Sequence, residues 1–163
     1  MNRKQQEEEF IHFDSCVSDL NDAWQILKLI KRRKLNSLRF AAFKFALIAY
    51  ARPYKISYGM VKSKHEPLGN AHIPQEHLEL HKRILAARDQ ILAHSDLGVK
   101  DAQLYVSEHS WGKFAGIVQN VIHGTEELPN IDGIIDLIEK TLNSLYKKRS
   151  DLEADLEPNF RTT

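Results

Sequence analysis

The sequence predicts an all-α fold, a helical bundle of four to five helices with a small variable insert before the last helix. Two observations support this: apolar residues recur at helical spacing in separate segments, and turn-forming residues divide those segments. A chain of 163 residues is long enough for one domain with its own core. We therefore expect a single domain over residues 1–163, with frayed ends at 1–8 and 156–163.

The first and last helices have the clearest periodicity. Apolar residues from Phe10 to Leu27 follow a 3-4-3-4-3 spacing, which places them on one helix face. The KRRK run at 31–34 closes this segment, either as a solvated helix end or as a phosphate-binding patch. The last helix is expected to begin after Asn130, a good N-cap. Its apolar face consists of Ile131, Ile134, Ile135, Ile138, Leu142 and Leu145.

Two more helices are expected between these. The segment LRFAAFKFALIAYAR (38–52) is apolar nearly all round, which is typical of the most buried helix in a bundle. Asn36 or Ser37 can cap its start, and Pro53 ends it. A long connection follows, and the next helix is expected to begin near Pro74 and to end near residues 94–98.

The region 99–130 has two interpretations. Leu104 and Val106 alternate with polar neighbours, which favours a short extended piece. Apolar residues from Phe114 to Ile122 have helical spacing, and Gly124 would end that helix. A β-hairpin across the same region is the alternative.

Composition narrows the functional classes. The formal net charge is +1, so a nucleic-acid contact would need a local patch rather than an overall basic field. Cys16 is the only cysteine, which excludes an internal disulfide and a cysteine-based zinc site. No stretch is long and apolar enough to span a bilayer, so no membrane partner is expected. The first ten residues, MNRKQQEEEF, lack the apolar core of a signal peptide, and we expect a cytoplasmic protein.

The helix after Pro74 carries polar residues where a core stripe is expected. Leucines recur there every seven residues, at 78, 85 and 92, and the companion positions hold His81, Arg88 and Ser95. Burying an unpaired arginine is very costly, so Arg88 needs an acidic partner, water, a groove or a second subunit. In the structural interpretation it pairs inside the bundle, and the candidate partners are Asp14, Asp89 and Asp96.

The residues from Arg88 to Asp96, RDQILAHSD, resemble the motif of the HEPN superfamily, in which a histidine follows an arginine and a polar residue at short spacing. The segment ALIAYARPY (46–54) also resembles the helix end that precedes this motif in abortive-infection-type members. The expected number and order of helices are similar to the family's bundle across most of the chain.

This resemblance implies a metal-independent endoribonuclease without a cofactor, of the kind found in toxin–antitoxin and phage-defence systems. Its substrate would be RNA, its partners a second copy in a homodimer and an antitoxin, and the two motifs would share one cleft. Arg88 and His94 would be the catalytic pair, and Asp89 would orient them. Asp96 stands where members that pair with a nucleotidyltransferase antitoxin often carry tyrosine, so that modification is not expected. The alternative is a non-catalytic HEPN-like module that binds RNA, nucleotide or protein.

The residue types suit this chemistry. Attack by a ribose 2′-hydroxyl needs a group that moves a proton near neutral pH, as histidine does, and a fixed positive charge on the phosphate, as arginine supplies. Six helical positions leave Arg88 and His94 roughly 120° apart on one straight helix. Residues from two copies lining one cleft relax this constraint, so the dimer is part of the expected mechanism.

Further RNA contacts are expected near this pair. Arg52, Tyr54 and Lys55 form a basic and aromatic cluster after the second helix, and His81 lies before Arg88 on the motif helix. We expect Arg52, Tyr54 and His81 to bind RNA; alternatively, Arg52 is a cation at the carbonyl end of its helix. His77 and His81 are four residues apart, but no HExxH order accompanies them, and no metal site is expected.

Overall fold

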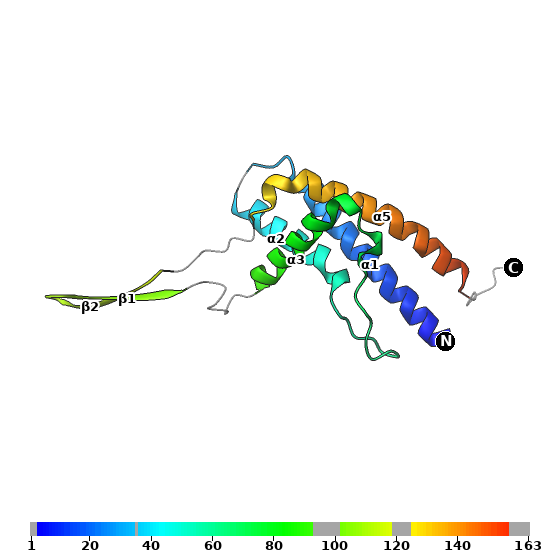
Figure 1. The fold of residues 1–163 in the computed structure, drawn as a ribbon, viewed down its shortest axis with the longest axis horizontal. Helices are drawn as coiled ribbons and strands as arrows, with labels where there is room; N and C mark the ends of the chain where they lie inside the picture. The colour runs from blue at the N-terminus through cyan, green and yellow to red at the C-terminus, as the bar shows by residue number, and fades with distance from the viewer. Residues whose placement is uncertain (1–2, 35, 93–101, 119–124, 157–163) are drawn as a thin grey trace.

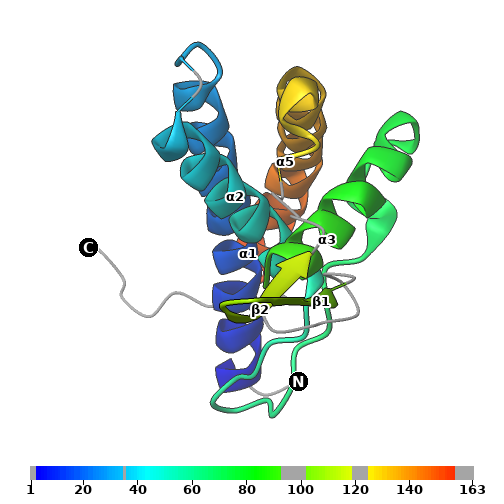
Figure 2. The same cartoon turned by 90° about the vertical axis from the view of Figure 1, so that its left-hand side faces the viewer.

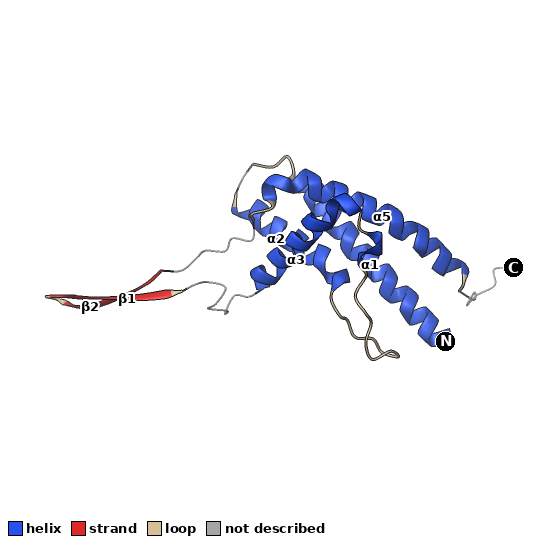
Figure 3. Ribbon diagram, in the orientation of Figure 1, coloured by secondary structure: helices blue, strands red, loops and turns tan. Residues whose placement is uncertain are grey.

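The computed structural model describes residues 3–34, 36–92, 102–118 and 125–156 (Figure 1). Within these ranges it contains four α-helices and one antiparallel two-stranded sheet. The helices are α1 (Arg3–Ile30), α2 (Ser37–Ala51), α3 (Leu78–Leu92) and α5 (Ile131–Ala154). The strands are β1 (Gln103–His109) and β2 (Gly112–Val118). The protein is therefore a helical bundle with a hairpin before the last helix; the predicted bundle is confirmed, and the all-α class applies to its helices but not to the insert (Figure 3).

The helices share one apolar core. α1 packs against both α2 and α5, and α2 packs against α3 (Figure 2). The fully buried members include Leu20, Leu27, Phe43, Leu47, Ile84, Ile134 and Ile138. None of the described helices combines the length and the apolar character needed to cross a bilayer.

The two outer helices agree with their periodicity. The predicted apolar face of α5 is buried along its length, and the helix begins at Ile131 directly after Asn130, as predicted. α1 already includes residues 3–8, so that part of the expected frayed end is helical. The KRRK run is exposed at the end of α1, where Lys31 Nζ lies 2.6 Å from Asp132 Oδ1 on α5. That position agrees with the helix-end interpretation of the run.

α2 is buried on one face only. Its start is capped as predicted, because Asn36 Oδ1 accepts a hydrogen bond of 2.8 Å from the Arg39 amide. Pro53 lies in a 3₁₀ turn, Arg52–Tyr54, that follows the helix. Leu38 and Phe45, however, are exposed on the outer side. The prediction of a helix buried all round is therefore only half correct, since α1 and α3 leave its outer face uncovered.

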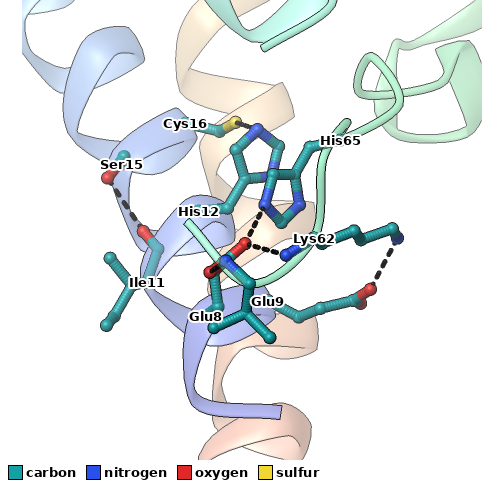
Figure 4. A network of polar contacts seen from close by, with 9 residues as sticks. Glu8, Glu9, Ile11, His12, Ser15, Cys16, Lys62 and His65 are labelled. Atoms are coloured by element: carbon teal, nitrogen blue, oxygen red, sulfur yellow. Dashed lines mark hydrogen bonds and ion pairs between the residues drawn. The ribbon is translucent and has the colours of Figure 1, made fainter. Parts of the chain in front are cut away.

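The connection between Pro53 and Ile73 is bound to α1 (Figure 4). An isolated antiparallel β-bridge joins Ser57 and His65 within this connection. The carboxylate of Glu8 on α1 accepts hydrogen bonds from the amides of Val61 and Lys62 and from His65 Nε2, the last at 2.9 Å. The buried His65 ring also stacks on His12, with ring centroids 4.3 Å apart. This long loop therefore has a defined anchor on the first helix.

The hairpin corrects the prediction for the variable insert. Residues 114–118 are in β2, so the helix predicted from Phe114 is wrong there and the alternative hairpin is confirmed. The turn at its tip uses Gly112, whose φ of 140° favours glycine. The spacing of the apolar residues suggested a helix because Ala115 and Gly116 separate Phe114 from Ile117 and Val118. In so short a segment, strand alternation and helical periodicity are hard to distinguish. Gly124 lies outside the described residues.

Candidate functional site

Arg88 lies near the end of α3, at the boundary between core and solvent. Its side chain is 24% exposed, and Nη1 donates a hydrogen bond of 2.8 Å to Asp89 Oδ1. Its Nε is buried and has no hydrogen-bond partner among the residues that the structure describes. Of the three partners considered for Arg88, Asp89 binds it, Asp14 instead binds Arg149 at 2.6 Å, and Asp96 lies outside the described residues. The guanidinium is thus held by one bond and remains partly accessible.

Asp89 also binds a second cation, Lys55. Lys55 Nζ lies 2.9 Å from Asp89 Oδ1 and 3.0 Å from Oδ2. Partial desolvation raises the pKa of the Asp89 carboxyl, but hydrogen bonds and charges from Lys55 and Arg88 outweigh it and hold that pKa below its usual value. Asp89 is therefore ionised at neutral pH, and the three side chains carry one net positive charge. We call Lys55, Arg88 and Asp89 the charged triplet.

A buried aromatic cluster holds the two elements of the triplet together. Tyr50 Oη and His81 Nδ1 form a hydrogen bond of 2.7 Å, and the His81 ring meets the Tyr54 ring edge-on at 4.5 Å. Burial lowers the pKa of His81 and raises the pKa values of both tyrosines, so the cluster is neutral at physiological pH. Since Tyr54 directly precedes Lys55, this packing places Lys55 beside α3.

Of the three residues expected to bind RNA, two are buried and one is accessible to solvent. Tyr54 and His81 are buried in the aromatic cluster and do not face solvent. Arg52 is about half exposed, binds Asp19 through Nη1 at 3.0 Å and lies over the Phe45 ring at 5.7 Å. Contact between RNA and either buried ring would require that ring to leave the core, whereas Arg52 is accessible.

His94, Ser95 and Asp96 lie outside the described residues. Of the expected catalytic pair, the structure therefore describes Arg88 and not His94. The structure brings together Arg88 and Asp89, which are neighbours in sequence, and adds Lys55 to them. The sequence grouped Lys55 with Arg52 and Tyr54 but gave no sign of its contact with Asp89. That contact joins positions 34 residues apart, beyond the reach of local spacing.

The histidines at 77 and 81 do not share a ligand. His77 Nε2 binds Asp136 Oδ2 at 2.7 Å, while His81 turns toward Tyr50. Within the described ranges, no group of three or more histidine, cysteine, aspartate or glutamate side chains is placed to hold a metal ion.

Comparison of the chain with protein-family models, with curated proteins and with solved structures finds no match. The charged triplet and its aromatic support therefore stand as the candidate site on their geometry.

Proposed function

We propose that this protein is a metal-independent endoribonuclease of the HEPN type that acts as a homodimer. One observation carries the proposal: at the end of α3, the guanidinium of Arg88 is fixed by Asp89, lies beside Lys55 and remains partly accessible. This arrangement offers a phosphate a planar, positively charged group whose position is set before binding. The motif RDQILAHSD begins at this arginine.

In the proposed reaction, Arg88 binds the scissile phosphate and stabilises the charge that develops on its oxygens. His94 takes the proton from the ribose 2′-hydroxyl or returns one to the leaving 5′-oxygen. Asp89 holds the guanidinium in place, and Lys55 adds a second cation beside it. Arg52, the accessible member of the expected RNA-binding set, would contact the RNA backbone further along.

On one straight helix Arg88 and His94 would point in different directions. In a dimer, residues from two copies can face a single cleft, which brings an arginine and a histidine together. The uncovered outer face of α2, with Leu38 and Phe45 exposed, supports an interface on the helical body. A toxin–antitoxin or phage-defence role and an antitoxin partner are proposed from the resemblance alone.

The test is RNA cleavage in EDTA with purified protein. We expect His94→Ala and Arg88→Ala each to abolish cleavage with unchanged far-UV circular dichroism. Arg83→Ala is the matched control, because Arg83 is an exposed arginine on the same helix that binds Glu127 and lies outside the triplet. A wild-type protein that leaves RNAs of varied sequence and structure intact would overturn the proposal, as would full activity in either motif variant.

A second candidate is a non-catalytic module that binds RNA, nucleotide or a protein partner. It is favoured by the bond between Arg88 and Asp89, which by itself explains how an arginine is accommodated at the edge of the core. Here Arg88 is structural, and Arg88→Ala should lower the free energy of unfolding. RNA binding without any cleavage would support this second candidate.

A further inference from the structure

The hairpin formed by β1 and β2 exposes an unusual amount of apolar surface. It lies apart from the helices in Figure 1, and among the described residues its two strands pair with each other only. More than half of each large apolar side chain in it is accessible, up to 75% for Trp111. These residues are Leu104, Tyr105, Val106, Trp111, Phe114, Ile117 and Val118. A two-stranded hairpin is marginally stable alone, so this surface indicates a contact with another chain.

The strand register sorts these side chains into two faces. Leu104 pairs with Ile117, Val106 with Ala115, and Glu108 with Lys113. Since paired residues point to the same side of a sheet, these six form one face, which we call the aliphatic face. It has apolar side chains along most of its length and one acidic and one basic residue, 3.9 Å apart, beside the turn.

The charge of the hairpin indicates what kind of partner it fits. Between residues 103 and 118, Glu108 and Lys113 are the only acidic and basic residues apart from His109. Such a neutral, apolar surface suits protein and not the phosphate backbone of RNA.

We propose that the aliphatic face stacks on the aliphatic face of a second copy of this chain, across a two-fold axis that runs along the hairpin. This axis places each β1 over the β2 of the other copy. Leu104 then meets Ile117 of the second copy, and Glu108 meets its Lys113, so that apolar and charged groups are both complementary. The charge pattern favours this axis, because a two-fold axis across the strands at Val106 would set Glu108 of one copy against Leu104 of the other and leave the charge opposite an apolar side chain.

The hairpins form only part of the dimer interface. Two strands of seven residues present a face of roughly 23 Å by 10 Å, or about 230 Å². A stable interface buries about 800 Å² on each partner, so the helical bodies must contribute the remainder. The inference deepens the dimer of the proposed function, but it does not depend on RNA cleavage.

The first experiment compares two variants with the same new charge one residue apart. Val106→Asp places a carboxylate on the aliphatic face, whereas Ser107→Asp places it on the opposite face. Molar mass is measured by light scattering during size-exclusion chromatography over a dilution series of the full chain. We expect wild type and Ser107→Asp to be dimers and Val106→Asp to dissociate. A monomeric wild type, or equal behaviour of the two variants, would overturn the proposal.

The second experiment tests the charge pairing by mixing. Glu108→Lys and Lys113→Glu each place like charges opposite one another in a homodimer, so each should dimerise about tenfold more weakly, given about 0.2–1 kcal/mol for each exposed pair. An equimolar mixture restores opposite charges at both positions and should dimerise like wild type. A mixture no tighter than its components would refute this two-fold arrangement. Circular dichroism checks that the helices are intact, and Arg88→Ala is expected to abolish cleavage while remaining dimeric, which separates the two proposals.

Discussion

Replacement of Tyr50 by phenylalanine tests whether His81 belongs to the core or to an RNA surface. The change removes the hydroxyl that lies 2.7 Å from His81 Nδ1. Tyr50 is fully buried and His81 is 2% exposed, so water cannot take the place of the lost hydroxyl. A buried polar atom left without its partner costs about 1–3 kcal/mol, and we expect the free energy of unfolding to fall by that amount.

The assay is urea unfolding followed by far-UV circular dichroism. Tyr146→Phe is the matched control, because the Tyr146 hydroxyl donates a 2.9 Å hydrogen bond to Asn21 Oδ1 at an exposed site, where water can replace it. This control should stay within about 0.5 kcal/mol of wild type. A Tyr50→Phe protein as stable as Tyr146→Phe would refute the reasoning.

A double-mutant cycle sharpens the result. Tyr50→Phe combined with His81→Leu removes both polar partners, so the double variant should lose less than the sum of the two single losses, with a coupling energy of about 1 kcal/mol. RNA affinity provides the second readout. If His81 contacted RNA from the surface, His81→Leu would weaken RNA binding and leave the free energy of unfolding unchanged.

Two further predictions concern pH and the loop anchored on α1. The free energy of unfolding should decrease as pH falls below about 6.5. Burial lowers the pKa of His12, His72 and His81 in the folded protein. The unfolded chain therefore binds protons at these histidines at a higher pH than the folded chain does. Urea titrations at pH 7.5 and 5.5 measure this, and equal stability at both would contradict it. Gly59→Ala should detach the loop and speed its proteolysis, since the added Cβ would lie 2.6 Å from the Lys62 carbonyl oxygen; Gly69→Ala, with open space around it, should digest like wild type.

The parts of the fold that sequence periodicity predicts are those with one buried face. α1 and α5 each bury a single stripe, so spacing alone fixed their position, and Asn130 marked the start of α5. Residues 114–118 were harder, because β2 is accessible on both faces and has no buried stripe to produce strict alternation. A strand that no other element covers has no buried face, so the spacing of its apolar residues does not separate a strand from a helix.

The candidate site shows the same limit in another form. The sequence marked His81 and Arg88 correctly as polar residues in a core stripe, but their partners decide what they do. Tyr50 is 31 residues from His81, and Lys55 is 34 residues from Asp89. Only the crossing of α2 and α3 brings these groups together. The sequence could identify both positions as unusual. The packing was needed to assign His81 to the core and Arg88 to the candidate site.

Asp89→Asn separates the two roles that remain for the charged triplet. The amide keeps the size of the side chain and removes its charge, so Lys55 and Arg88 lose their shared counterion. If Asp89 positions Arg88 for catalysis, single-turnover cleavage should slow by tenfold or more, while RNA binding tightens and its dependence on salt steepens by about one phosphate contact. Asp132→Asn removes another exposed carboxylate that pairs with a lysine, and it should leave both measurements unchanged. If cleavage is unaffected and only binding changes, Asp89 merely shields the cations, and the arginine does not depend on it for its orientation.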